Sequence, residues 1–253
     1  MDSNPVIISR RRALGLLSTT ALGVALVGCG ESSSSQAGSP TTTTTAPSTT
    51  SSTSTSTSTP ATSGTTATST SCVLQPEVTE GPYYLDLNKV RQDITEGRPG
   101  APLDLQITVV NATTCKPIPN AAVDIWHCDA VGTYSGFGNA SRDTTFLRGI
   151  QLSDANGLAS LQTIYPGWYQ GRAVHIHLKV HVGGSVIHTG QLFFDDTLSD
   201  TVYQAAPYNT KGNRDRRNSS DSIYSQSGGT ASIVDTKANG SRYTGLITVG
   251  VKA

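Results

Sequence analysis

The sequence predicts an all-β fold, an antiparallel β-sandwich with long loops and little helix, over residues 72–253. Segments that alternate polar and apolar side chains, or that are rich in β-branched residues, recur at short intervals. Turn signals such as "NATT", "DANG" and "GG" stand between them. No segment keeps a helical period between capping residues. This combination is typical of two sheets packed face to face.

Seven strands are expected in this region. The expected strands are residues 103–110, 121–127, 145–152, 158–164, 174–182, 185–194 and 243–251. Two of them should form a hairpin that turns at Gly183-Gly184, since a two-residue glycine turn matches the twist of paired strands. The polar stretch 195–240 predicts a long excursion with one short helix before the last strand.

The first 29 residues predict an export signal. Arg10, Arg11 and Arg12 precede a short apolar run at 13–27, and "SRRRAL" resembles a twin-arginine signal. "LVGC" resembles a lipobox, which would make Cys29 the lipid-bearing N-terminus of the mature chain. The alternative is an ordinary signal peptide cleaved nearby. We expect a protein exported to the extracytoplasmic face of the membrane as a lipoprotein, or secreted.

Residues 30–71 predict a disordered tether. From 31 to 71, 30 of 41 residues are serine or threonine, with one charged residue and no large apolar side chain. Such a composition cannot bury enough surface to offset the entropy of ordering it.

Residues 72–253 are then one domain by size. They carry 15 basic and 16 acidic side chains. This balance disfavours nucleic acid or an anionic surface as a partner and favours a small molecule.

Three cysteines, Cys72, Cys115 and Cys128, lie in the exported domain, where disulfides persist. An odd number predicts one pair and one free thiol, and the spacing does not say which two pair. The chain has no Cys-x-x-Cys or other zinc-type spacing.

The segment "GWYQGRAVHIHLKV" places His175 and His177 on one face of a single strand, because side chains alternate along a strand. A histidine pair of this kind is by itself weak evidence for a metal. Tyr134, in the glycine-containing turn "WHCDAVGTYSGF", and Tyr169, just ahead of the pair, strengthen it. Two phenolates and two imidazoles favour a trivalent ion, and iron(III) above zinc or copper. Asp129 is expected to cap the turn that presents Tyr134.

The motifs "EGPYY", "IWHCDAVGTYSG", "FLRGIQLSDANG", "TIYPGWY", "GRAVHIH" and "GQLFF" occur in an order that resembles the intradiol ring-cleaving dioxygenases, and most closely their secreted, lipoprotein-like branch. The resemblance implies a prealbumin-like β-sandwich with one non-haem iron(III) per chain. It also implies O2-dependent cleavage of catechol-type rings between the two hydroxyl-bearing carbons, which gives cis,cis-muconate-type diacids.

Carried over by position, the resemblance assigns functional residues. The four iron ligands fall on Tyr134, Tyr169, His175 and His177. The same resemblance implies that Tyr169 accepts a proton from the substrate. It places Arg172 and Gln191 beside the substrate ring. Pro82 and Tyr84 would line the substrate pocket, with Tyr83 a weaker candidate.

Two other functions are compatible with parts of the sequence. A non-catalytic, tethered aromatic-binding module would use the same aromatic residues as a platform. A cupin-type metalloenzyme would need a third histidine and a carboxylate at suitable spacing, which the sequence lacks.

The loop between Tyr169 and His175 is shorter than in cytoplasmic relatives and predicts a more open pocket. The ring substituents and the oligomeric state are not predicted.

Overall fold

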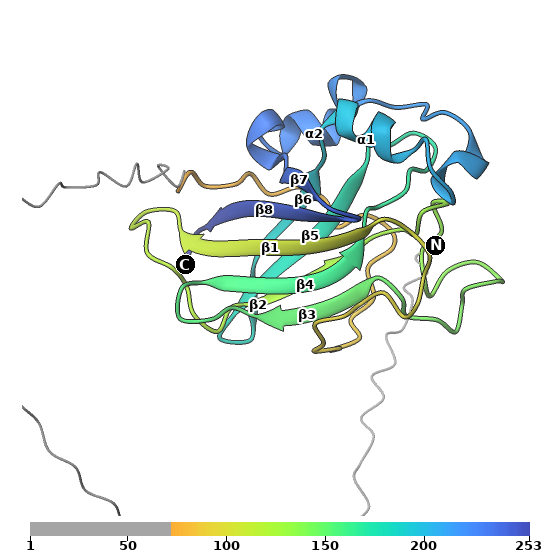
Figure 1. Ribbon diagram of the computed structural model, residues 1–253. Helices are drawn as coiled ribbons and strands as arrows, with labels where there is room; N and C mark the ends of the chain where they lie inside the picture. Colours follow the sequence, from red (N-terminus) through yellow and green to blue (C-terminus); the bar gives the residue numbers. More distant parts are fainter. Residues whose placement is uncertain (1–71) are drawn as a thin grey trace, which may run out of the picture. The chain divides into compact units, whose positions relative to one another are not determined.

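A computed structural model describes residues 72–253, so the expected signal peptide, Cys29 and the tether lie outside the described residues. Two four-stranded sheets face each other, in the orders β4-β1-β8-β7 and β3-β2-β5-β6 (Figure 1). Their strands are β1 Pro102–Asn111, β2 Ala122–Trp126, β3 Arg148–Leu152, β4 Leu158–Ile164, β5 His175–Val182, β6 Ser185–Phe193, β7 Asp235–Asn239 and β8 Arg242–Val251.

The predicted sandwich and all seven expected strands are confirmed, with ends that differ by a few residues. The hairpin of β5 and β6 turns at Gly183-Gly184, and both glycines have positive φ. The sequence reading missed β7, because this strand is polar, mostly exposed and paired only with β8. One pairing departs from an antiparallel sandwich, since β1 and β8 run parallel.

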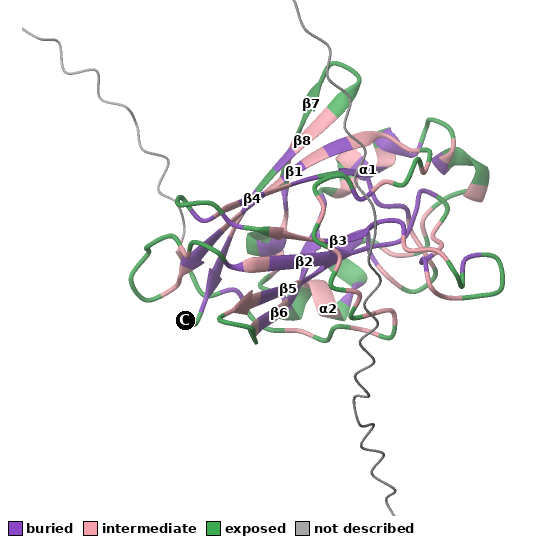
Figure 2. Ribbon diagram, turned by 90° about the horizontal axis from the view of Figure 1, so that it is seen from below, coloured by how far each residue is buried: buried purple, intermediate pink, exposed green. Residues whose placement is uncertain are grey.

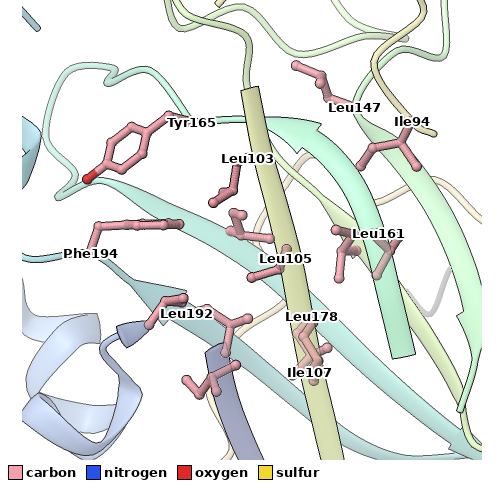
Figure 3. Packing of buried hydrophobic residues seen from close by; sticks show 14 of the residues in the cluster. Ile94, Leu103, Leu105, Ile107, Leu147, Leu161, Tyr165, Leu178, Leu192 and Phe194 are labelled. Carbon is pink, nitrogen blue, oxygen red and sulfur yellow. The ribbon is translucent and has the colours of Figure 1, made fainter. Parts of the chain in front are cut away.

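The core lies between the two sheets. Burial alternates along β1, so that Leu103, Leu105 and Ile107 point inward, where Leu178 of β5 and Leu192 of β6 meet them (Figure 3). Side chains alternate along β2 and β5, so the residues that do not point into the core lie on the outer face of the second sheet. That outer face carries Asp124, Trp126, His175, His177 and Lys179.

The outer face of the second sheet is itself covered, and β2 and β5 are buried along most of their length (Figure 2). The cover is the N-terminal segment 72–98, here called the strap. Its backbone donates from Gln75 to Gly250 of β8, from Val78 to Thr189 of β6 and from Arg91 to Ile150 of β3. The strap therefore crosses the whole sheet.

The excursion after β6 contains more helix than expected, although every helix is short. It holds α1 Asp196–Val202, α2 Ser222–Gln226 and three 3-10 turns, Tyr208–Lys211, Asn218–Ser220 and Gly229–Ser232, gathered at one side of the sandwich near β6 (Figure 1). Asp195 and Asp221 cap α1 and α2. No helix within residues 72–253 has the length and apolarity required to cross a membrane.

A disulfide joins Cys72 to Cys115, and Cys128 is a buried free thiol. This resolves the pairing that the spacing left open. The bond fastens the start of the strap to the connection between β1 and β2.

Loss of this bond should destabilise the domain. We expect Cys72→Ser with Cys115→Ser to lower the free energy of unfolding by about 3 kcal/mol, because a closed loop of this length restricts the unfolded chain. Urea denaturation measures the loss, and mapping of unreduced peptides checks the pairing. A linkage through Cys128 would contradict the structure.

His127 gives the metal-free protein a pH-dependent stability. Burial lowers the pKa of His127 to about 4, while its Nδ1 bonds Cys128 O and its Nε2 bonds Thr163 Oγ1. The folded state prefers the neutral ring, so this contribution is lost as pH falls from about 6.5 toward 4.

Between about pH 7 and pH 4.5 we expect wild type to lose about 2–3 kcal/mol more unfolding free energy than His127→Gln. Urea denaturation of both metal-free proteins at the two pH values measures this difference. His175 and His177 are present in both proteins, so the effect of their own burial cancels, and only the small effect of the His127 charge on their pKa differs. Identical pH dependence would show that His127 is not the group responsible.

Candidate metal centre

Four donor atoms from three parts of the chain converge at one end of the outer face of the second sheet. Tyr169 Oη lies 3.1 Å from Nε2 of His175, which lies 3.1 Å from Nε2 of His177, which lies 3.1 Å from Tyr134 Oη. Tyr134, His175 and His177 are buried, and Tyr169 is partly exposed.

The two histidines are held by different means. Nδ1 of His175 lies 2.7 Å from the carbonyl of Ala173. A carbonyl only accepts, so Nδ1 carries the proton and the Nε2 lone pair is free. The ring of His177 stacks on Trp126 with 5.0 Å between ring centroids. Gly81 of the strap lies against its other side, where a Cβ would stand 3.1 Å from Cε1 of His177.

A tight turn after β2 presents Tyr134. Oδ1 of Asp129 accepts hydrogen bonds from the amides of Val131 and Thr133, at 3.1 and 2.8 Å, which confirms the expected cap. Gly132 has a φ of +83°, a conformation that favours glycine. The turn thus fixes the direction in which Tyr134 leaves the backbone.

The loop that carries Tyr169 packs directly on this turn. At Gly167 an added Cβ would overlap the backbone of Asp129 and Ala130, and at Gly132 it would overlap the carbonyl oxygen of Trp168. The two backbones approach closely only because both positions lack a side chain. This approach brings Tyr169 to within 5.7 Å of Tyr134, measured between ring centroids.

The electrostatics of the cluster favour neutral groups when no cation is present. Burial lowers the pKa of His175 to about 3 and that of His177 well below its usual value. Burial also raises the pKa of Tyr169 to about 12 and that of Tyr134 well above its usual value. In every case desolvation disfavours the charged form.

These residues fit a metal ion. Nε2 of His175 presents a lone pair to Nε2 of His177 at 3.1 Å, and both nitrogens can bind one metal ion when the ring proton of His177 lies on Nδ1. Ligands that are about 2.1 Å from one ion and at right angles stand about 3 Å apart, as here. Among residues 72–253, no group of three or more His, Cys, Asp or Glu side chains could hold a metal. The two phenol oxygens, each 3.1 Å from a histidine Nε2, complete this donor set, and hard anionic oxygen favours a trivalent ion.

Arg172 and Gln191 lie together beside the cluster. Arg172 Nη2 donates to Oε1 of Gln191 at 2.6 Å, and Gln191 stands opposite His177 in the pairing of β5 with β6. The positive charge of Arg172 lowers the pKa of Tyr134 and of Tyr169 and so opposes the effect of their burial. The same charge also lowers the pKa of His175 and of His177, in the same direction as their burial. The two residues predicted to flank a substrate are thus adjacent to each other.

The three residues of the strap motif have different surroundings. Pro82 is exposed. Tyr84 turns away from the donor atoms, with its hydroxyl 3.2 Å from Oδ2 of Asp124 and Nζ of Lys179 3.7 Å from its ring centre. Tyr83 instead stacks on Tyr134, with ring centroids 4.3 Å apart. Tyr83 is the residue of the motif that covers the centre.

Sequence reasoning missed two further neighbours of the centre. Trp126 could have been found from strand alternation, since it shares the outward face with Asp124. Asp221, which bonds Arg172, lies in the polar excursion, where the only local signal is that an aspartate often precedes a helix. Nothing in the sequence near Asp221 points to Arg172.

A family model described as Dioxygenase matches residues 79–226, more than half of the chain. An intradiol ring-cleavage dioxygenase from Tetranychus urticae is 35% identical, with a TM-score of 0.68 over 71% of this chain and 95% of that one. The chain belongs to the intradiol ring-cleaving dioxygenase family.

The dioxygenase domain of a dioxygenase carbohydrate-binding protein fusion from Streptomyces sp. SirexAA-E is 28% identical, with a TM-score of 0.54 over 70% of this chain and 96% of that one. A catechol 1,2-dioxygenase from Acinetobacter baylyi is 34% identical over 37% of this chain and 32% of its own length. A chlorocatechol 1,2-dioxygenase from Cupriavidus pinatubonensis is 28% identical over 48% and 56%. The matched part therefore spans about a third to just over half of these curated relatives.

The contact of Gly81 with His177 can be tested against a matched glycine. Gly81 and Gly97 have similar positive φ values, +72° and +71°, but an added Cβ meets nothing within 4 Å at Gly97. Gly97→Ala should cost about 1–2 kcal/mol for the backbone conformation alone. Gly81→Ala should cost about 1 kcal/mol more, because the strap or the His177 ring must shift. Urea denaturation of both variants measures the difference, and equal losses would contradict close packing of the strap on His177.

Proposed function

We propose that the protein is a non-haem iron(III)-dependent intradiol dioxygenase. It cleaves catechol-type rings between the two hydroxyl-bearing carbons with O2 and yields cis,cis-muconate-type diacids. The observation that carries the proposal is the series of 3.1 Å contacts that joins Tyr169, His175, His177 and Tyr134. Membership of the intradiol family and the catechol 1,2-dioxygenases among its relatives support the substrate class.

Tyr134, Tyr169, His175 and His177 would hold iron(III), which when bound would supply Lewis-acid chemistry toward a catechol-type substrate. The chain's own residues do the rest. The lone pair on Nε2 of His175 is already available as a ligand, and His177 offers Nε2 when its ring proton is on Nδ1, whereas each tyrosine has to release a proton when the metal binds. Metal binding is therefore expected to weaken as pH falls.

Tyr169 is the better placed of the two phenols to exchange a proton with an entering substrate. Its ring is partly exposed, while Tyr134 is 4% exposed and covered by Tyr83. The adjacent Arg172 also favours the phenolate form of Tyr169. Tyr169 is thus the residue that, as a phenolate, would accept a proton from a substrate hydroxyl and become a neutral phenol, while Tyr134 keeps its position.

Arg172 and Gln191 orient the substrate and respond to its charge. The guanidinium presents a fixed positive charge beside the donor atoms, where it stabilises negative charge that develops on the ring. The side-chain amide of Gln191 is bonded on both sides, to Arg172 and to the carbonyl of Thr79. Gln191 therefore limits how far either the guanidinium or the strap can move.

A non-catalytic aromatic-binding module is the alternative function. Tyr83, Tyr134, Phe137 and Tyr169 do form an aromatic cluster that could bind a flat ligand. That function gives no reason for two imidazoles and two phenols to converge in a series of 3.1 Å contacts within the cluster, and we therefore favour the enzyme.

The place of action proposed here is outside the cytoplasm. Arg10 to Arg12, the apolar run that follows and the "LVGC" motif support export and a lipid anchor on Cys29. The disulfide between Cys72 and Cys115 suits an oxidising compartment. If Cys29 carries the lipid anchor, Cys29→Ser should release the chain from membranes. Cell fractionation measures this release.

Catalysis is tested with the iron-loaded full chain and catechol, hydroxyquinol and protocatechuate. We expect oxygen uptake and a ring-opened diacid that carries both atoms of labelled dioxygen, detected by mass spectrometry. His177→Gln and Tyr134→Phe should lower kcat/KM by about 10³-fold or more, because several kcal/mol of charge stabilisation depend on the metal.

The matched control is His181→Gln, which changes a half-buried histidine on the same strand and face. This variant should keep wild-type activity, because His181 lies four residues beyond His177, about 13 Å along the strand. If protein that holds iron takes up no oxygen with catechol, hydroxyquinol or protocatechuate, the proposed function is refuted.

A further inference from the structure

Asp221 is a buried carboxylate in the polar excursion, 49 positions from Arg172 in the sequence. Its Oδ1 accepts from the amides of Ile223 and Tyr224 at the start of α2, at 2.8 and 3.3 Å. Its Oδ2 accepts from Nε of Arg172 at 2.9 Å and from the amide of Ala173 at 2.8 Å. Both oxygens of the carboxylate are therefore used.

The contacts of Asp221 exceed what a helix cap needs. One side-chain oxygen satisfies the exposed amides of a first helical turn. The second oxygen points away from α2, at the loop that leads into β5. Burial raises the pKa of Asp221, but the hydrogen bond from the Ala173 amide and the charge of Arg172 outweigh burial, so that the carboxylate is the stable form.

The guanidinium of Arg172 is consequently held through two of its nitrogens. Nε is bonded to Asp221, and Nη2 is bonded to Gln191, whose own amide nitrogen donates to the carbonyl of Thr79 at 2.9 Å. Two bonds from different nitrogens to two separate acceptors restrict both the position and the plane of a guanidinium. Nη1 makes no hydrogen bond within residues 72–253 and remains available to a substrate.

We propose that Asp221 is a positioning residue: it holds the Arg172 guanidinium at the metal centre in the orientation that stabilises charge on the bound ring. The excursion between β6 and β7 thereby contributes to the active site, although none of its residues is a metal ligand. This inference rests on the proposed function, because Arg172 acts on a substrate only if the centre binds one.

Two substitutions separate positioning from capping. Asp221→Asn replaces one acceptor oxygen with an NH2 group. In one orientation of the amide this NH2 group faces the backbone N–H donors of α2, and in the other it faces the N–H donors of Arg172 and Ala173. Asp221→Ser keeps a hydroxyl able to cap α2 but lacks the oxygen that reaches Arg172. Asp221→Ser is therefore informative even if Asp221→Asn folds poorly.

Ser227→Ala is the matched structural control. Ser227 is buried, and its hydroxyl donates to the carbonyl of Ile223, so the substitution loosens α2 without a change to any contact of Arg172.

The test compares these variants as full, iron-loaded chains. Iron content, kcat for catechol in air, and the anaerobic Kd of 4-nitrocatechol are measured for each. With Asp221→Asn and Asp221→Ser we expect kcat to fall about 10- to 100-fold, as for a misaligned catalytic group, while iron content stays at the wild-type level and Kd changes less than about threefold. Ser227→Ala should keep the wild-type kcat.

A double-mutant cycle with Arg172→Gln completes the test. If Asp221 acts through Arg172, Asp221→Ser should lower kcat less than about twofold further in the Arg172→Gln background. A full additional loss in that background, or a wild-type kcat in both Asp221 variants, would overturn the inference and leave the proposed function intact. A wild-type protein that neither binds 4-nitrocatechol nor cleaves catechol would overturn both.

Discussion

The close approach of two neutral imidazole rings to two phenol oxygens is the constraint on which the rest of the structure depends. His175 and His177 face each other at 3.1 Å inside a buried cluster, and Nε2 of His175 presents a lone pair there. The strand alternation of β5 sets both rings on one face, and the strap and Trp126 exclude water from His177. Two glycines, Gly132 and Gly167, let the tyrosine-bearing segments meet.

The residues around the centre join parts of the chain that are far apart in sequence. A continuous series of hydrogen bonds runs from Asp221 through Arg172 and Gln191 to the backbone of Thr79. It connects the excursion, the loop before β5, strand β6 and the strap. The disulfide then fastens the far end of the strap to the β1–β2 connection. The orientation of the Arg172 guanidinium thus depends on contacts between segments that lie far apart in the sequence.

The sequence was sufficient to predict the sandwich and the meeting of the four donor residues. Alternation and glycine turns define β1 to β6 and β8, and family motifs mark both tyrosines. β7 was missed because it lacks an apolar face, and the use of Tyr83 rather than Tyr84 as the cover of Tyr134 depends on the path of the strap. The Cys72–Cys115 pair and the Asp221–Arg172 bond are long-range contacts, which local patterns do not encode.

Resonance Raman spectroscopy of the full chain loaded with iron(III) tests the central claim most directly. Excitation in the visible charge-transfer band should enhance tyrosinate vibrations from two distinct ligands. Tyr134→Phe and Tyr169→Phe should each remove one set and leave the other. An iron-loaded protein without tyrosinate vibrations, or with a spectrum that neither substitution changes, would contradict a centre formed by Tyr134, Tyr169, His175 and His177.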